Sequence, residues 1–282
     1  MFSLYEIASF LGRPVCLYEF SWGPTKYRYT SADRDITYGT EVVDELTVPI
    51  VWTALPISDN GFTQGISSQD FVVTVPSTIP VVGLFRTTPP STSIDLVCRR
   101  FHRDDPAQEA VVYWTGTVGN VKRPDNVAKA EIIGLPITST IRKTGLRLCW
   151  ELNCNHALYD EGCKADKTLF NTPAVITELT PTTITVDTLG AFPPERYAGG
   201  FLEWEATAEG TIDRRAIEAW VEGTTLAMLG STDRLLVGQA ITLYLGCDLT
   251  AATCQGVFNN LANHSGYHFM PRKSPFDGDP IF

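Results

Sequence analysis

Four cysteines in the C-terminal half of this 282-residue chain have the spacing to bind a metal centre. Eight residues separate Cys154 from Cys163, six separate Cys247 from Cys254, and 83 lie between the two pairs. The flanking stretches G-C-D-L-T-A-A-T-C and D-E-G-C are rich in small residues, which let thiolates converge on an iron–sulfur cluster with backbone N–H groups aimed at sulfur. We predict one cluster that is bound by all four thiolates and holds both ends of the intervening segment together.

Zinc and disulfides remain open as alternatives for these thiols. Four-cysteine zinc sites are common, although structural zinc sites usually place about two to four residues between paired ligands. Two disulfides would suit an oxidising compartment, and the seven cysteines are an odd number. However, the N-terminus M-F-S-L-Y-E-I-A-S-F-L carries Glu6 where a secretory signal has a basic residue, and its apolar stretch is short. We therefore expect no signal peptide. We expect the thiols to be reduced and to bind a metal.

The other cysteines and the nearby histidines are weaker candidates for ligands. Cys16 and Cys98 lie in β-patterned segments without a partner at metal-ligand spacing, and we expect both to be small buried apolar residues. Cys149 is similar, but it lies five residues before Cys154 and is an alternative ligand. Three histidines flank the pairs and are expected to form hydrogen bonds or to lie at the surface: His156, His264 and His268.

No catalytic motif accompanies these residues. The chain lacks G-x-S-x-G, H-E-x-x-H, a P-loop and the glycine-rich dinucleotide-binding motif. Close pairs of carboxylates fall in turn-like stretches, where solvated loops explain them: Asp33 with Asp35, Asp44 with Glu45, and Asp104 with Asp105. We therefore expect a protein that is not an enzyme.

The charge balance argues against binding to nucleic acid or to an anionic membrane. The net charge is −10 and the sequence pI is about 4.9, so the basic surface that such binding needs is missing. No run approaches the roughly 20 apolar residues of a membrane-spanning helix. We expect no membrane association by the chain itself, whereas a role beside DNA, as a wall that repels phosphate, remains compatible with this charge.

The elements that position the cysteines are predicted to be strands, because short β-branched segments punctuated by Gly and Pro run along the chain. The expected fold is mainly β. Residues 1–150 are predicted to form a β-barrel region, with two small barrels divided near residue 70, and residues 151–282 a small β-rich domain clipped by the cysteines. A strand over 145–152 is expected to lead into the first pair. Helical character is limited to short turns near 104–109 and 250–261.

The chain resembles the tail-tip (baseplate) hub proteins of long-tailed phages and gene transfer agents. The resemblance rests on the C-terminal run G-C-D-L-T-A-A-T-C-Q-G-V-F-N-N-L-A-N-H-S-G-Y, the ending P-F-D-G-D-P-I-F, the pattern A-G-G-F-L-E-W and the early segment L-Y-E-F-S-W-G-P-T-K-Y-R-Y-T-S-A-D-R-D-I-T-Y, so it spans nearly the whole chain. Both cysteine spacings also resemble those of the minor tail protein L family of lambda-like phages, whose C-terminal domain carries a 4Fe–4S cluster.

The resemblance implies a virion structural protein at the tail tip, assembled in the host cytoplasm. It implies a homotrimeric ring that continues the tail tube and joins the distal tail protein ring to the central fibre or receptor-binding hub protein. The tape-measure protein would end in this ring, and DNA would only pass through its lumen. The implied ligands of the 4Fe–4S cluster are Cys154, Cys163, Cys247 and Cys254. A zinc-stapled binding module and an iron–sulfur electron-transfer protein are the alternative functions.

Overall fold

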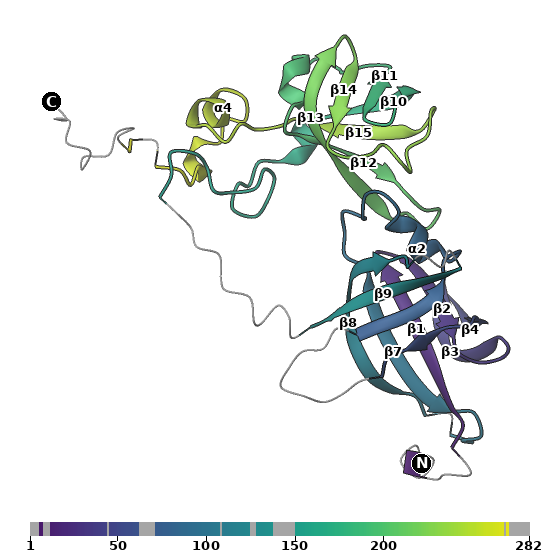
Figure 1. Cartoon of the computed structure of the whole chain (residues 1–282). Coiled ribbons are helices and arrows are strands. Elements are labelled where there is room, and N and C mark those ends of the chain that lie inside the picture. Colours follow the sequence, from purple (N-terminus) through teal and green to yellow (C-terminus); the bar gives the residue numbers. More distant parts are fainter. Residues whose placement is uncertain are drawn as a thin grey trace. The chain divides into compact units, whose positions relative to one another are not determined.

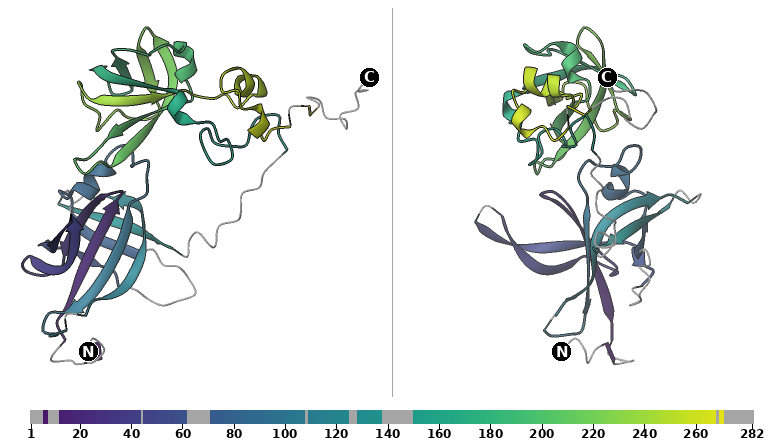
Figure 2. Two further views of the ribbon diagram at one scale, coloured as in Figure 1. Left: turned by 180° about the vertical axis from the view of Figure 1, so that it is seen from behind. Right: turned by 90° about the vertical axis from the view of Figure 1, so that its left-hand side faces the viewer.

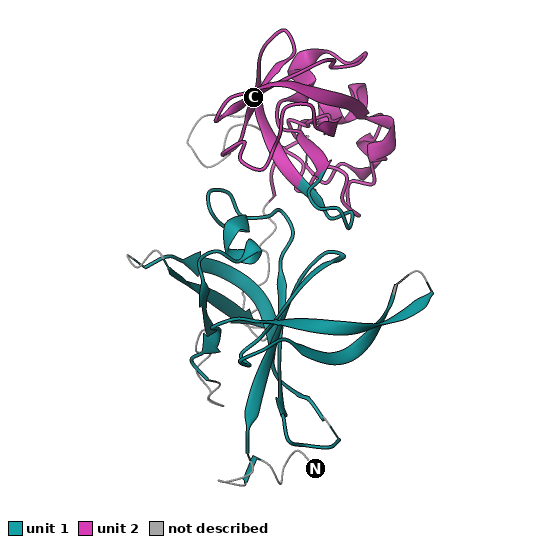
Figure 3. Ribbon diagram, turned by 90° about the vertical axis from the view of Figure 1, so that its right-hand side faces the viewer, with its two compact units in different colours: residues 1–143, 205–213 teal, residues 144–204, 214–282 magenta. Residues whose placement is uncertain are grey.

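The computed structural model divides the chain into two compact units (Figure 3). Unit 1 contains residues 1–143 and 205–213, and unit 2 contains residues 144–204 and 214–282. Strands predominate in both units, which confirms the mainly β prediction. Cys149, His268 and residues 145–149 of the predicted strand lie outside the described residues, which are 6–7, 12–43, 45–61, 71–107, 109–124, 128–137, 150–267 and 269–270.

Over the described residues, unit 1 is built on a nine-stranded sheet with the order β3-β4-β2-β1-β7-β8-β9-β6-β5 (Figure 1). A short helix, α2 (Pro80–Leu84), accompanies it. We expected two small barrels divided near residue 70, whereas β5 and β6, on either side of that position, pair within this one sheet. The strands are β1 (Pro14–Trp22), β2 (Thr25–Thr30), β3 (Ile36–Val43), β4 (Leu46–Ala54), β5 (Ser58–Asp59), β6 (Phe71–Pro76), β7 (Asp95–His102), β8 (Val111–Lys122) and β9 (Lys129–Pro136).

The interior strand β1 has apolar residues on both faces because both of its faces are buried. Successive side chains of a strand point to opposite faces. Tyr18 and Phe20 therefore enter the larger core, while Leu17 enters a smaller core on the other face. In the smaller core Leu17 packs with Trp52 and Phe101. This two-sided burial explains the near-continuous apolar sequence of β1.

A partly buried carboxylate ties the edge strand β5 back to the middle of the sheet. The hydroxyl groups of Tyr18 in β1 and Tyr113 in β8 both donate to Oδ2 of Asp59, the former at 2.6 Å. Tyr18 is only 1% exposed. Burial, the nearby Cys16 thiol and the Asp59 carboxylate all raise the pKa of Tyr18, so its hydroxyl keeps its proton and acts as the donor. The sheet is therefore curved so that β5 approaches β1.

We expect Asp59→Ala to destabilise unit 1 by about 1–3 kcal/mol, since the buried hydroxyl of Tyr18 would lose its acceptor and an unsatisfied buried group costs about that much. Urea unfolding followed by far-UV circular dichroism, with hydrogen exchange across β5 and β6, measures the change. Asp33→Ala is the control, because its side chain is 76% exposed and bonds Arg103 at the surface, where an ion pair contributes about 1 kcal/mol or less. Equal midpoints for both variants would contradict this role of Asp59.

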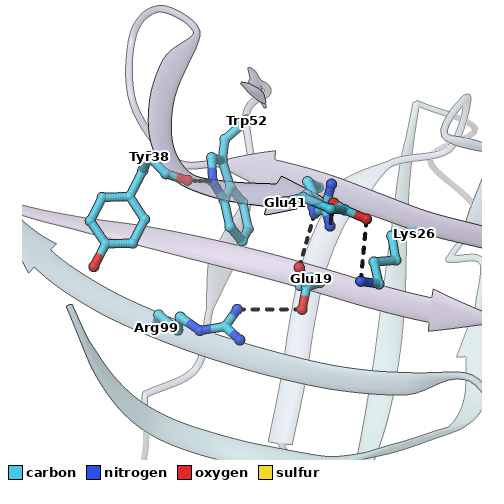
Figure 4. Close-up of polar contacts among 7 residues, drawn as sticks. Glu19, Lys26, Tyr38, Glu41, Trp52 and Arg99 are labelled. Atoms are coloured by element: carbon cyan, nitrogen blue, oxygen red, sulfur yellow. Dashed lines mark hydrogen bonds and ion pairs between the residues drawn. The ribbon is translucent and has the colours of Figure 1, made fainter. Parts of the chain in front are cut away.

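Strands β3 and β4 continue beyond the rest of the sheet as a hairpin (Figure 2, right). A ladder of charges on neighbouring strands secures its base (Figure 4). Arg28 in β2 bonds Glu41 in β3 and, at 2.9 Å, Glu19 in β1. Lys26 adds a second cation beside Glu41 at 3.5 Å, and Arg99 lies 3.5 Å from Glu19. The guanidinium of Arg28 lowers the pKa of Glu41, so this carboxylate is ionised at neutral pH.

Unit 2 contains a closed barrel with the strand order β10-β11-β14-β13-β12-β15 (Figure 1). We expected a small sheet between the cysteine pairs; β10 and β15, the first and last of these strands, instead pair with each other and close it. Its strands are β10 (Asn171–Leu179), β11 (Thr183–Val186), β12 (Phe201–Glu205), β13 (Ile212–Glu222), β14 (Thr225–Met228) and β15 (Ala240–Tyr244). The short helices are η1 (Lys167–Leu169), η2 (Pro194–Tyr197), α4 (Ala251–Gly256) and η3 (Leu261–Asn263).

The helices of the described residues are all short, and none has the length and apolar character needed to cross a bilayer. The turn predicted over 250–261 contains α4, whereas the described residues of 104–109 form turns without a helix.

Candidate metal centre

The four predicted cysteines line one pocket of unit 2. Cys154 and Cys163 come from the segment before the barrel, and Cys247 and Cys254 from the segment after it. All four are free thiols. The structure therefore brings together residues that are up to 100 positions apart in the sequence. The remaining lining residues are His156, Leu158, Leu249, Phe258, Asn260 and Asn263.

Barrel closure explains why the two pairs meet. Strand β10 begins eight positions after Cys163, and β15 ends three positions before Cys247. These strands are antiparallel, with Asn171 opposite Tyr244, so the entry to the barrel lies beside its exit. Beyond the barrel, the N–H of Cys154 donates to the carbonyl of Leu249 at 2.8 Å. Backbone pairing alone thus brings the two cysteine-bearing segments together.

A glycine contact sets the position of the second pair. Gly246, directly before Cys247, donates its N–H to the carbonyl of Arg196 at 2.8 Å. A Cβ atom at Gly246 would lie 2.0 Å from the carbonyl oxygen of Ala198 and 2.5 Å from the nitrogen of Gly200. A Cβ atom at Gly200 would in turn lie 2.2 Å from the Tyr244 carbonyl oxygen. The backbones here approach too closely for any side chain, which requires glycine at both positions.

An aspartate closes the loop of each pair. In the first loop the Asp160 carboxylate accepts the N–H of Cys163 at 2.6 Å. In the second loop Asp248 accepts the N–H of Thr250 at 3.0 Å and the hydroxyl of Thr253 at 2.9 Å. The hydrogen bond from Cys163 is the main cause of the lowered pKa of Asp160. At Asp248 burial is the largest single effect and acts to raise the pKa, but the hydrogen bonds from Thr250 and Thr253 together outweigh it, so this pKa is lowered as well. Both carboxylates are therefore ionised and order their loops at neutral pH.

The two loops also hold strained backbone. Among the described residues, six non-glycine residues have positive φ, and four of them lie in or next to these loops. A left-handed non-glycine residue costs about 1–2 kcal/mol. Such strain gathers where a structure must hold particular groups in place, and it points to a site rather than to ordinary connections. The four residues are Tyr159, Lys164, Leu249 and Asn259.

Among the described residues, hydrogen-bond partners lie beside the sulfurs of Cys154, Cys163 and Cys247. The N–H of Leu249 lies 3.3 Å from the Cys247 sulfur, and the Asn260 amide lies 3.6 Å from the Cys163 sulfur. The hydroxyl oxygen of Ser265 lies 3.4 Å from the Cys154 sulfur. N–H and O–H groups aimed at sulfur are the usual surroundings of thiolate ligands. Asn260 and Ser265 were not among the residues singled out from the sequence.

The thiols influence each other's ionisation. Burial, followed by the charges of the neighbouring thiols, raises the pKa of Cys254. Burial also raises the pKa of Cys247, followed by the charges of Asp248 and of the other thiols, against a hydrogen bond from Leu249. At Cys154 burial acts to raise the pKa, but hydrogen bonds from Ser265 and from the His156 N–H outweigh it, and the pKa is lowered. A thiolate at one of these positions therefore disfavours ionisation of the others.

The histidines near the pocket bond to the backbone. His264 accepts the N–H of Gly266 at Nδ1, 3.1 Å away, and its Nε2 lies 3.3 Å from the Leu249 carbonyl oxygen, so both ring nitrogens are engaged. His156 places Nδ1 3.2 Å from the Asn263 carbonyl oxygen, and its ring lines the pocket. Elsewhere, Cys98 is buried as expected, whereas Cys16 is only half-buried.

The donor set fits an iron–sulfur cluster. Four cysteines line one pocket, and hydrogen-bond donors lie beside three of their sulfurs in the described part of the chain. Once deprotonated, such sulfurs are the soft ligands that iron–sulfur clusters use. In the part of the chain that the structure describes, no group of three or more His, Cys, Asp or Glu side chains stands close enough together to hold a metal ion as the side chains lie, and this finding does not distinguish a cluster from zinc. Four-thiolate sites also bind zinc, so zinc stays as the chemical alternative.

Comparisons with known proteins found a match to a family model and a similar fold among solved structures. Residues 195–274, which include the second cysteine pair, match the family model described as "Phage conserved hypothetical protein BR0599". No curated protein matches the chain. A chain from a solved structure titled "Virion of native gene transfer agent (GTA) particle" is similar over 99% of both chains, with a TM-score of 0.70 and 17% sequence identity. This protein therefore shares its fold, along its whole length, with a chain of a gene transfer agent virion.

Proposed function

We propose that this protein is a non-enzymatic structural subunit of the virion of a phage or gene transfer agent, located at the tail tip. The observation that supports the proposal most is the fold similarity to a gene transfer agent virion chain over 99% of both chains. The phage family match over 195–274 supports it independently.

Within the tail tip, the proposed role is that of a baseplate hub. Three copies would form a ring that continues the tail tube, between the distal tail protein ring and the central fibre or receptor-binding hub protein. The tape-measure protein would end in this ring. The acidic balance of the chain, −10 overall, suits a lumen through which DNA passes without binding, because like charges repel the phosphates.

The proposed cofactor is a 4Fe–4S cluster held by Cys154, Cys163, Cys247 and Cys254. The convergence of these residues on one pocket supports it. When bound, the cluster supplies coordinate bonds that cross-link the segments before and after the barrel. The chain itself contributes the barrel that aligns the segments, the aspartates that close the loops, and the donors that face sulfur. We propose that the cluster has an architectural role.

Deleting the gene in a producing strain is expected to reduce the titre of infectious or gene-transferring particles to background, because particles without a hub cannot complete their tails. Titre, electron microscopy of the particles and quantitative mass spectrometry of purified virions measure the outcome. Complementation with the wild-type gene, or with Cys16→Ser as a cysteine control outside the pocket, should restore the titre. A normal titre after deletion, or absence of the protein from purified virions, would rule out the proposed role.

A further inference from the structure

We infer that Asn260 and Ser265 are positioning residues for the bound cluster, and that they donate hydrogen bonds to the sulfurs of Cys163 and Cys154, respectively. This inference rests on the cluster proposed above. It assigns a role to the polar stretch N-N-L-A-N-H-S that follows the second cysteine pair, at residues 259–265.

Asn260 joins one cysteine of each pair. Its main-chain N–H donates to the carbonyl of Cys254 at 3.0 Å, and its side-chain nitrogen donates to the carbonyl of Cys163 and lies 3.6 Å from the Cys163 sulfur. The orientation of the amide is fixed by a neighbour, since the side-chain nitrogen of Asn263 donates to Oδ1 of Asn260 at 2.6 Å. The NH₂ group of Asn260 is thereby directed to Cys163.

Ser265 acts in the same way on Cys154. Its hydroxyl oxygen already accepts the N–H of Asn155 at 2.7 Å. The hydroxyl proton is therefore available for the Cys154 sulfur at 3.4 Å, the direction expected when that sulfur is a thiolate ligand. Both sulfurs of the first pair thus receive a side-chain donor from the segment that follows the second pair.

These donors have a chemical consequence beyond holding loops together. A hydrogen bond to a thiolate withdraws negative charge from sulfur, which favours the more reduced, more negative form of a bound cluster. It also orients the ligand, and removal of such outer partners typically weakens metal binding about 10–100-fold. Loss of either donor should therefore shift the midpoint potential to more negative values and speed the release of iron.

The test uses the full chain purified without oxygen, as wild type, Asn260→Ala and Ser265→Ala. Transfer of iron to a chelator is expected to be about 10-fold or more faster in each variant, consistent with the effect of removing outer partners. The midpoint potential should fall in both, and Ser265→Thr, which keeps the hydroxyl, should restore wild-type values. Gln255→Ala is the matched control, because this exposed amide on α4 bonds Asn259 at 3.0 Å rather than a ligand.

Asn260→Asp covers the case in which the alanine variant does not fold, since it keeps the shape and the acceptor for Asn263 but removes the donor to sulfur. Wild-type potentials and iron release in Asn260→Asp and Ser265→Ala would overturn the inference while leaving the proposed cluster intact. A wild-type protein that contains no iron and no sulfide would overturn both.

Discussion

Replacing any one of Cys154, Cys163, Cys247 and Cys254 by serine is expected to remove most of the iron and sulfide from the protein. The wild-type chain, purified without oxygen, should contain about four of each, as a 4Fe–4S cluster requires. Because the two pairs are 83 residues apart, loss of the cross-link also releases unfolded-chain entropy, and unit 2 should lose on the order of a few kcal/mol. Metal and sulfide analysis and thermal unfolding measure the two effects.

Cys16→Ser is the control for this series, since Cys16 is half-buried in unit 1 and takes no part in the pocket. It should keep its full content of iron and sulfide. A colourless wild-type protein that contains stoichiometric zinc would show that the site binds zinc and not an iron–sulfur cluster. Full iron content in any of the four pocket variants would show that the replaced cysteine is not a ligand.

Gly246→Ala is expected to disrupt both the barrel exit and the metal centre. The new methyl group would meet backbone atoms at 2.0–2.6 Å, and no flexible side chain can yield. The two backbones must separate, which breaks the hydrogen bond from Gly246 to Arg196 and displaces the adjacent Cys247. We expect a loss of about 3 kcal/mol or more, at the upper end of overpacking effects, together with loss of iron. Urea unfolding and iron content measure these changes.

Gly256→Ala is the matched control, because a Cβ atom at Gly256 meets nothing within 4 Å and the residue lies in helix α4. Alanine should stabilise the helix slightly there, by up to about 1 kcal/mol. If Gly246→Ala unfolded at the wild-type urea concentration and retained its iron, the close approach at this position would have no structural role.

The sequence was enough to predict that the four cysteines come together, because their residue types and spacing are visible in it. It was not enough to predict the closed barrel that lies between the two pairs. Two pairs of thiols in small-residue loops suggest a shared site, and the pocket brings them together. Barrel closure depends on pairing between β10 and β15, about 70 residues apart, for which short-range patterns hold no signal. The periodicity therefore showed strands but could not show that the first would pair with the last.

The polar surroundings of the pocket were also invisible in the sequence. Asn260 and Ser265 stand in an ordinary polar stretch, and their partners become evident only when side-chain directions are known. Leu249 and Tyr159 adopt left-handed backbone although neither residue type favours it, so local propensity predicts the opposite. In unit 1, Asp59 resembled any turn carboxylate until two tyrosines from distant strands were found on it.

The pairing of β10 with β15 bears on the order of events during maturation. Because the barrel is closed by its own backbone pairing, it brings the thiols together before any iron is bound. With the proposed cluster, iron delivery would be a late modification of a folded precursor, rather than the event that starts its folding. A particle whose iron had been stripped by oxidants would accordingly keep the barrel and lose order first in the loops beside it.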